Sequence, residues 1–344
     1  MAVENSDEAR GQLPIVPAGS RPPAALGSSR ATLEPRSFEL RRPSAWLRWA
    51  ARLLLTRPQR QAIYLFYRHA IFRVRASLSS VAPLDFMVPF RCNICGTANR
   101  VSHRQFAREF QSCTECGSSL RMRAVVRCLS LLLFGRSLSL TEMSANPSIQ
   151  GIGLSDWEGY SGDLARLFSY RNTFFHTEPR VDITDPPRDL LGTLDFLIST
   201  DVFEHVPPPV DRAFAGAFAL LKPGGALVLS VPFHKAAATV EHFPTLNDFQ
   251  LLRFGEDYYL MNQRRDGTYE MFDRLVFHGG PGETLEMRFF SESDLIAHLG
   301  RAGFEKIVVH RENDPLAGII HHHERCSVPI TAIKPAATEP GSPA

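Results

Sequence analysis

The chain has 344 residues, of which 44% are hydrophobic, and a formal net charge of +2. This length allows one large buried core with a smaller accessory module, and the mild charge excludes a nucleic-acid footprint spread over the whole protein. The N-terminal stretch MAVENSDEAR lacks the apolar segment of a signal peptide. Because the chain also has no apolar run of about 18 residues, we predict a cytoplasmic protein.

The N-terminal region divides into two parts. Residues 1–43 are rich in Pro, Ser, Ala and Arg without periodicity, which predicts a disordered tail. In residues 44–80, apolar residues recur at helical spacing on both sides of Pro58, which predicts two amphipathic helices in series. Arginines outnumber acids here, so the helices either pack on the main domain or contact an anionic membrane surface or a partner. The apolar stripes favour packing.

Residues 88–120 carry the most specific motif, two CxxC pairs that are each followed by a glycine. The four cysteines are Cys92, Cys95, Cys113 and Cys116. Thiolates at this spacing turn toward one ion, and the glycine lets the loop tighten around the sulfurs, so we predict a zinc ribbon with one structural Zn²⁺. Two disulfides or four free thiols are the alternative, which a reducing compartment disfavours. The arginines between the pairs are weak evidence for nucleic-acid binding, and we favour a scaffolding role.

Residues 121–334 alternate short apolar runs with amphipathic segments, which predicts an α/β fold with a doubly wound, mostly parallel sheet. An apolar helix ends at Gly135, and a later helix has Ser291 as its N-cap. The predicted strands are SIQGIGL, NTFFHTE, LDFLIST, GALVLSVPF, EKIVVH and SVPITAIK. Residues 234–286 are aromatic and irregular, which predicts an insertion, and residues 335–344 form a second disordered tail.

Two segments carry a resemblance to a known family. DFLISTDVFEHVPPP and ALLKPGGALVLSVPF are similar to class I S-adenosylmethionine-dependent methyltransferases, whose fourth strand leads into an EHV-like segment and whose fifth follows an LKPGG turn. The chain most resembles a bacterial group with an N-terminal zinc-ribbon-like cysteine module and a YHGDP-like segment in the insertion. Residues 277–281 read FHGGP, so the aspartate of that segment is absent.

The resemblance implies a Rossmann-like fold that binds S-adenosylmethionine and transfers its methyl group to a small-molecule or glycan-type acceptor, with nucleic acid not expected. The residues it implies for the cofactor are Gly151, Gly153, Ser155, Asp156, Glu178, Asp182 and Asp201. Glu178 would accept hydrogen bonds from both ribose hydroxyls. Asp182, or alternatively Asp185, would accept one from the adenine amino group. The two glycines would let the backbone pass close to the cofactor, and the remaining three polar residues would serve the methionine end.

Methyl transfer from a sulfonium is an in-line displacement, so the protein mainly aligns the acceptor and excludes water. A base is needed only if the acceptor starts protonated, and the candidates are His205, His234 and His278. The loop after the first strand has displaced glycines, which leaves one alternative open. In it, the protein is a catalytically inactive binding module whose ribbon and basic helices engage nucleic acid, protein or a membrane surface.

Overall fold

The computed structural model describes residues 85–278, 284–321 and 327–336. The chain separates into two units, Met1–Arg42 and Pro43–Ala344, and every described residue belongs to the second. The tail predicted for residues 1–43 and the helices predicted for residues 44–80 therefore lie outside the described residues, as does most of the C-terminal tail. In the described part of the chain, no helix has the length and apolar character needed to cross a membrane.

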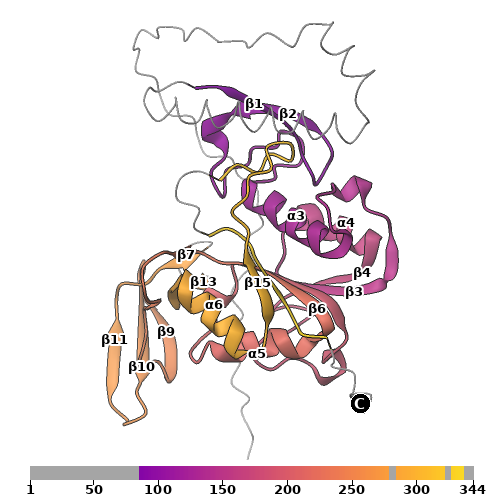
Figure 1. Ribbon diagram of the computed structural model, residues 1–344. Helices are drawn as coiled ribbons and strands as arrows, with labels where there is room; N and C mark the ends of the chain where they lie inside the picture. Colours follow the sequence, from indigo (N-terminus) through magenta and orange to yellow (C-terminus); the bar gives the residue numbers. More distant parts are fainter. Residues whose placement is uncertain (1–84, 279–283, 322–326, 337–344) are drawn as a thin grey trace, which may run out of the picture. The chain divides into compact units, whose positions relative to one another are not determined.

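A six-stranded sheet with the order β15-β16-β6-β5-β3-β4 is the centre of the fold (Figure 1). Its strands are β3 (Asn146–Leu154), β4 (Phe168–Thr173), β5 (Leu194–Thr200), β6 (Leu221–Ser230), β15 (Glu305–Val309) and β16 (Ile330–Ile333). Strands β3 to β6 pair in parallel, whereas β16 runs antiparallel to both β6 and β15. The prediction of a doubly wound, mostly parallel sheet is confirmed.

Helices cover both faces of this sheet. They are α3 (Leu120–Phe134), α4 (Glu158–Leu167), α5 (Asp211–Leu220) and α6 (Glu292–Arg301). Successive side chains of a strand point to opposite faces. Accordingly, Leu197 of β5 lies in one core with α5 and α6, and its neighbour Ile198 lies in a second core with α3 and α4. Helix ends follow the predicted signals, because Gly135 adopts a left-handed φ of 67° and Ser291 accepts the N–H of Asp294.

Two predicted boundaries are wrong. We predicted that the second strand spans NTFFHTE, but β4 is FSYRNT and ends at Thr173. Phe168 and Tyr170 are buried on the sheet, whereas Phe175 is 50% exposed, so burial decides the strand. The LKPGG segment lies inside β6 rather than before it. In the described stretch between β4 and β5 the only regular element is the 3₁₀ helix η3 (Arg188–Leu190).

The cysteine module precedes the sheet. It contains the antiparallel strands β1 (Met87–Arg91) and β2 (Ala98–Ser102), followed by the short helix η1 (His103–Gln105). Another 3₁₀ helix, η2 (Leu140–Glu142), connects α3 to β3. The guanidinium of Arg123, fully buried in α3, donates to Ser112 Oγ, Ser118 O and Gly318 O. These bonds tie the module to α3 and to a loop near the end of the chain.

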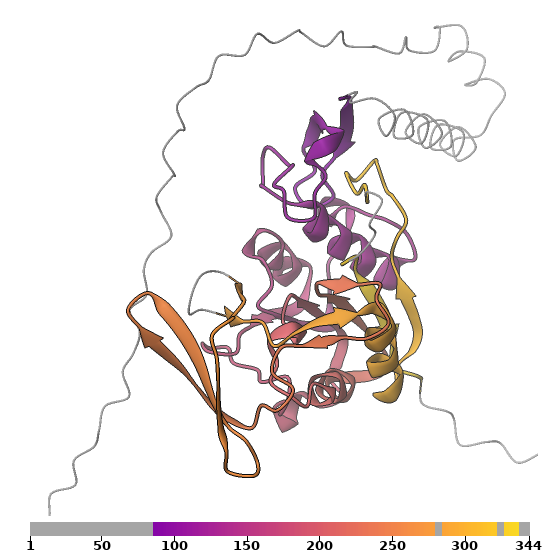
Figure 2. The ribbon, with the colours of Figure 1, turned by 90° about the vertical axis from the view of Figure 1, so that its left-hand side faces the viewer.

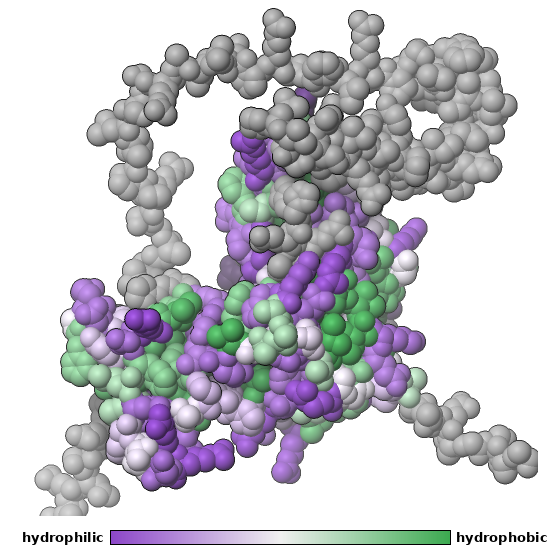
Figure 3. All heavy atoms as spheres, turned by 60° about the vertical axis from the view of Figure 1, so that its left-hand side comes forward, coloured by the Kyte–Doolittle hydropathy of each residue, from purple (hydrophilic) through white to green (hydrophobic). Residues whose placement is uncertain are grey.

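The insertion after β6 consists of short strands. They are β7 (Phe233–His234), β8 (Val240–Glu241), β9 (Asp248–Phe254), β10 (Asp257–Gln263), β11 (Tyr269–Phe272), β12 (Phe277–His278), β13 (Thr284–Leu285) and β14 (Arg288–Ser291). Strands β11-β10-β9 form an antiparallel sheet that extends away from the main sheet (Figures 1 and 2). Hydrophobic and hydrophilic side chains are interspersed over the face seen in Figure 3. Through β12 to β14 the insertion returns to the main sheet.

Candidate functional site

The carboxyl ends of the central strands leave the sheet through two strained residues. Ser155 follows β3 with a φ of 55°, and Asp201 follows β5 with a φ of 53°. The N–H of Ser155 donates to Thr173 O at 2.7 Å, and that of Asp201 to Ser230 O at 2.7 Å. Both segments therefore turn sharply at the same edge, where open α/β sheets bind ligands.

Asp156 is turned into the protein at this edge. It is 3% exposed, its Oδ2 accepts the hydroxyl of Tyr170 at 2.7 Å, and its Oδ1 accepts no hydrogen bond among the described residues. Burial raises the pKa of this carboxyl to about 7. A Cβ on Gly153 would lie 2.2 Å from Asp156 Oδ2, and one on Gly151 would lie 2.2 Å from the Phe196 ring. Both glycines thus face protein side chains.

Asp201 is paired with arginines from outside the sheet. Arg108, which follows the module's strands, lies 2.5 Å through Nη2 from Asp201 Oδ1 and 3.3 Å from Ser230 Oγ. Nε of Arg121 in α3 lies 3.4 Å from Asp201 Oδ2. The cysteine module therefore supplies a positive charge to the edge of the sheet. The sequence analysis missed this role, because only the fold brings Arg108 to strand β5.

Glu178 and Asp182 lie in the segment after β4. Glu178 is exposed, and its Oε2 accepts the N–H of Arg180 at 2.9 Å. Asp182 is partly buried, and its Oδ1 accepts the N–H and the hydroxyl of Thr184 at 2.9 and 2.7 Å. No contact among the described residues joins either carboxylate to Asp156, so their assignments to ribose and adenine stay predictions.

Glu204, His205 and His278 form a second constellation, beyond the end of β5. Glu204 and His205 belong to the 3₁₀ helix η4 (Phe203–His205), and His278 comes from β12. The side chain of Glu204 has no exposed surface, and neither carboxylate oxygen takes part in a hydrogen bond. Its Oε1 lies 3.8 Å from His205 Nε2 and 3.9 Å from His278 Nδ1. Burial, reinforced by the charge of Asp201, raises the pKa of Glu204 well above its usual range.

The far sides of the two rings are held by hydrogen bonds. His205 Nδ1 lies 2.9 Å from Leu285 O, and His278 Nε2 lies 2.8 Å from Glu286 Oε2. The other oxygen of Glu286 lies 2.8 Å from His242 Nε2. Each ring thus donates on its far side, so its second nitrogen, which faces Glu204, carries a lone pair.

Arg288 fixes the helix that carries Glu204. It is fully buried, and its Nη1 donates to Phe203 O at 3.2 Å and to Val206 O at 2.5 Å. The N–H of Met287 donates to Glu204 O at 2.8 Å. Residues 285–288, which read LEMR, therefore hold both the backbone of η4 and the rings beside Glu204.

The structure brings together two of the three predicted histidines. His234 lies in β7, its Nδ1 accepts the N–H of Ala236 at 3.1 Å, and no described contact joins it to His205 or His278. The sequence analysis missed Glu204 and Glu286. For Glu204 a signal existed, since a carboxylate beside a histidine in the EHV segment offers a second ligating or titrating group.

The four predicted zinc ligands converge. Their Sγ atoms all lie within 4.8 Å of one another, with Cys92 and Cys116 3.7 Å apart and Cys95 and Cys113 3.6 Å apart. A regular tetrahedron with Zn–S bonds of about 2.3 Å has edges of about 3.8 Å, whereas a disulfide needs about 2.05 Å. The donor set and its spacing therefore fit one tetrahedral ion.

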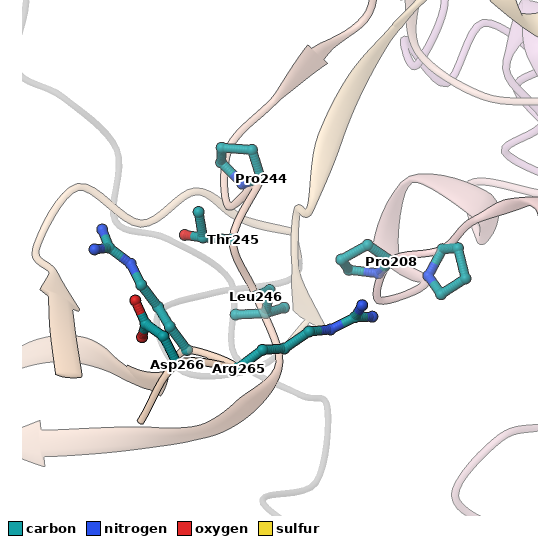
Figure 4. A pocket seen from close by; sticks show the side chains of 8 residues that line it. Pro208, Pro244, Thr245, Leu246, Arg265 and Asp266 are labelled. Carbon is teal, nitrogen blue, oxygen red and sulfur yellow. The ribbon is translucent and has the colours of Figure 1, made fainter. Parts of the chain in front are cut away.

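Two hollows lie near these sites. The first hollow has a volume of about 540 Å³ and lies between the segment after η4 and the insertion. In Figure 4, Arg265 extends from the insertion toward Pro208. A second of about 420 Å³ is lined by the first residues of β4 and β5, Phe168 and Leu194, at the opposite edge of the sheet from Asp156. Neither lining includes Glu204, His205 or His278.

Comparison with known proteins identifies the family. Residues 135–309 match the model of the methyltransferase domain family. The chain belongs to this family. The predicted resemblance to class I methyltransferases is thereby confirmed at the level of the family, and the matched residues include Asp156, Glu204 and most of the insertion. The cysteine module lies before the match.

The chain also has distant matches among solved structures. An S-adenosylmethionine-dependent methyltransferase from Clostridium acetobutylicum is 14% identical, with a TM-score of 0.32, and the alignment covers 54% of this chain and 83% of that one. An amino pentose methyltransferase from Micromonospora echinaspora is 13% identical, with a TM-score of 0.35 and coverages of 63% and 92%. No curated protein matches the chain.

Proposed function

We propose that the chain transfers the methyl group of S-adenosylmethionine to a hydroxyl of a small-molecule or glycan-type acceptor. The family match supports the reaction class. The observation that carries the proposal is the convergence of Asp156, after β3, and the Glu204–His205 pair, after β5, at one edge of a parallel sheet. The cofactor would supply a sulfonium-bound methyl group, whose carbon the acceptor oxygen attacks in line while the carbon–sulfur bond breaks.

The residues at this edge fit the methionine end of the cofactor. Asp156 Oδ1 and Ser199 Oγ are buried polar atoms without hydrogen-bond partners among the described residues; Ser199 of β5 pairs with Leu154, two residues before Asp156. An ammonium group would satisfy such acceptors. Ser155 lies beside Asp156 at the same strand end, and Asp201, already paired with Arg108, closes the edge from the side of β5. Glu178 would hold the ribose and Asp182 the adenine.

Deprotonation of an acceptor hydroxyl falls to the cluster of Glu204, His205 and His278. His205 is held with a lone pair on the nitrogen that faces Glu204, and burial lowers its pKa, which favours the neutral ring. His234 makes no described contact with the cluster, so we assign it no part in this step. The first hollow is lined by Pro208 and Pro209, which follow η4 in the chain, and we propose it as the place of the acceptor.

We further propose that Cys92, Cys95, Cys113 and Cys116 hold one structural Zn²⁺. Four thiolates leave no open coordination position, so the ion would fold the module rather than take part in methyl transfer. The module in turn presents Arg108 to Asp201. Because Arg108 is engaged inside the molecule and the family match covers the sheet, the alternative of an inactive binding module is not favoured.

Calorimetric titration with S-adenosylhomocysteine tests the cofactor assignments. Glu178→Ala removes two charge-assisted hydrogen bonds of roughly 1.5 to 3 kcal/mol each before water compensates, so affinity should fall about tenfold or more. Asp182→Ala should weaken binding less, because one contact is lost. His205→Ala should leave cofactor affinity unchanged, since it faces the acceptor. Absence of binding by the unaltered chain near millimolar ligand would contradict the proposed function itself.

A further inference from the structure

We propose that Glu204, His205 and His278 form a binding site for a divalent transition-metal ion. One atom from each, the carboxylate Oε1, Nε2 and Nδ1 respectively, lies within 4.8 Å of the other two. The catalytic use of such an ion rests on the proposed function, whereas its binding does not. The site is distinct from the four cysteines, which lie in the N-terminal module.

The separations within the cluster are longer than hydrogen bonds and slightly longer than those of ligands sharing an ion. At 3.8 and 3.9 Å, the two imidazole nitrogens are too far from Glu204 Oε1 for a hydrogen bond. Ligand atoms about 2.0 to 2.2 Å from one ion are roughly 3.3 to 3.6 Å apart in a tetrahedron, so small movements of the side chains complete the site. A direct pair between acid and base would be shorter.

Because Glu204 is buried without a hydrogen bond, its ionised form needs a positive charge beside it. A carboxylate with no exposed surface and no hydrogen bond is costly to keep ionised in the interior. Arg108 is paired with Asp201, and Arg288 is bonded through Nε and Nη1 to Glu241 and to backbone carbonyls, while its Nη2 has no hydrogen-bond partner among the described residues. The two atoms that do face Glu204 are imidazole nitrogens. A cation bound between all three satisfies the carboxylate and both lone pairs at once.

The surrounding contacts are those that orient metal-binding histidines. A ligating imidazole usually donates its other N–H to a carbonyl or carboxylate, which fixes the tautomer and raises the basicity of the ligating nitrogen. His205 does so to Leu285 O, and His278 does so to Glu286. Both rings therefore aim a lone pair at the same space as Glu204. The two rings also pack edge to face, with their centroids 4.6 Å apart.

The donor set indicates the class of ion and of acceptor. Two imidazoles with one carboxylate suit Zn²⁺, Fe²⁺, Co²⁺ or Mn²⁺, whereas Mg²⁺ and Ca²⁺ prefer oxygen ligands alone. Three protein ligands leave positions open for an acceptor hydroxyl. With the ion bound, the lone pair of His205 is engaged by the metal, so the cluster promotes deprotonation through the ion and not through the ring. Coordination makes the hydroxyl more acidic: its proton passes to water, its oxygen forms the bond to the methyl carbon, and the carbon–sulfur bond breaks with its electron pair going to sulfur. The acceptor class is thus a metal-coordinating hydroxyl compound.

Cobalt titration of the full chain tests the site. The chain is first saturated with Zn²⁺ and freed of weakly bound metal by a mild chelator, so that the cysteines are occupied. Co²⁺ is then added and its visible d–d absorption recorded. We expect one further equivalent of Co²⁺ to bind without thiolate charge-transfer bands. Glu204→Gln, which keeps the side-chain volume, should lower the affinity at least about tenfold, and so should His278→Ala.

His234→Ala serves as the matched control, because His234 lies outside the cluster, and it should bind Co²⁺ like the unaltered chain. Titration with S-adenosylhomocysteine on the same samples reports whether each variant is folded. Absence of the further equivalent in the unaltered chain would overturn the inference, as would unchanged affinity in both cluster variants. Cobalt binding without S-adenosylhomocysteine binding would uphold the metal site and contradict the proposed function. S-adenosylhomocysteine binding without cobalt binding would uphold the proposed function and overturn the metal site.

Discussion

Glu286 holds His278 through a contact of 2.8 Å between Oε2 and Nε2, and thereby determines which nitrogen of the ring faces Glu204. The same carboxylate holds His242 through its other oxygen. Glu286 is therefore a positioning residue for the cluster. It contacts the side of the His278 ring that faces away from Glu204, and so orients the nitrogen that faces Glu204. Its loss should affect metal binding more than folding.

The first prediction concerns this contact. Glu286→Gln replaces an acceptor for two imidazoles by an amide that accepts from one, so His278 loses its preferred orientation. Affinity for Co²⁺ should fall about 10- to 100-fold while affinity for S-adenosylhomocysteine stays the same. Glu292→Gln is the control, because Glu292 pairs with Arg311 in another part of the fold. Equal cobalt affinities for Glu286→Gln and its control would show that Glu286 does not position His278.

The second prediction concerns Arg288, the buried clamp on η4. Arg288→Met keeps an apolar stem but leaves Phe203 O and Val206 O without their donor. The free energy of unfolding should fall by about 2 to 4 kcal/mol, because buried carbonyls and Glu241 lose a charged partner. Urea unfolding measures the change. Arg301→Met, which removes an exposed pair with Asp211, should cost less than about 1 kcal/mol. Similar losses in both variants would contradict the role of Arg288.

The sequence predicts the sheet well because its signals are local. Apolar runs of strand length mark β3, β5 and β6, and single residues such as Gly135 and Ser291 mark helix ends through their own backbone preferences. The cysteine cluster is predictable for the same reason, since each CxxC pair sits on one turn. The prediction for β4 fails because burial against the sheet decides which residues form the strand, and the sequence pattern alone does not show that Phe168–Thr173 are the residues buried there.

The candidate site depends on contacts between distant parts of the chain. Arg108 meets Asp201 across 93 positions, and Arg288 meets Phe203 across 85. Periodicity and spacing carry no information about such pairs, because they are set by how the cysteine module and the insertion pack against the residues that follow β5. Thus the sequence indicates His205 and His278 as separate candidates, but it does not show that the buried carboxyl of Glu204 lies near both rings.

The third prediction concerns the cysteine module. Cys113→Ser replaces a thiolate ligand by a hydroxyl, so after a mild chelator has removed metal from the Glu204 cluster the chain should contain well under one equivalent of Zn²⁺ per molecule. Elemental analysis measures the metal, and thermal unfolding should show a less stable module. Cys128→Ala is the control, because Cys128 is buried in α3 and lies outside the cluster of four. Full zinc content in Cys113→Ser, or none in the unaltered chain, would contradict the proposed zinc site.

The last prediction concerns Asp156 and pH. Burial raises the pKa of this carboxyl from 3.8 to about 7, while Tyr170, Tyr160 and Arg121 act in the opposite direction. In the folded chain Asp156 therefore holds its proton up to about pH 7, whereas in the unfolded chain it has lost it by about pH 4. Between these values the folded state binds more protons, so the free energy of unfolding falls as pH rises. The full effect is on the order of 4 kcal/mol and is complete above pH 7.

Asp156→Asn removes this titration while it preserves the size of the side chain. Between pH 5 and pH 8 the stability of the variant relative to the unaltered chain should rise by about 2 to 3 kcal/mol, because only the unaltered chain buries a charge at the higher pH. Urea unfolding at both values measures the difference, and Asp189→Asn, a change at an exposed position in η3, should leave the profile unaltered. At pH 8 the variant should also bind S-adenosylhomocysteine more weakly, since a carboxylate attracts the ammonium group more strongly than an amide does. A variant that gains stability at pH 8 and keeps full affinity would separate the two roles: Asp156 would then be a buried acid that does not contact the cofactor.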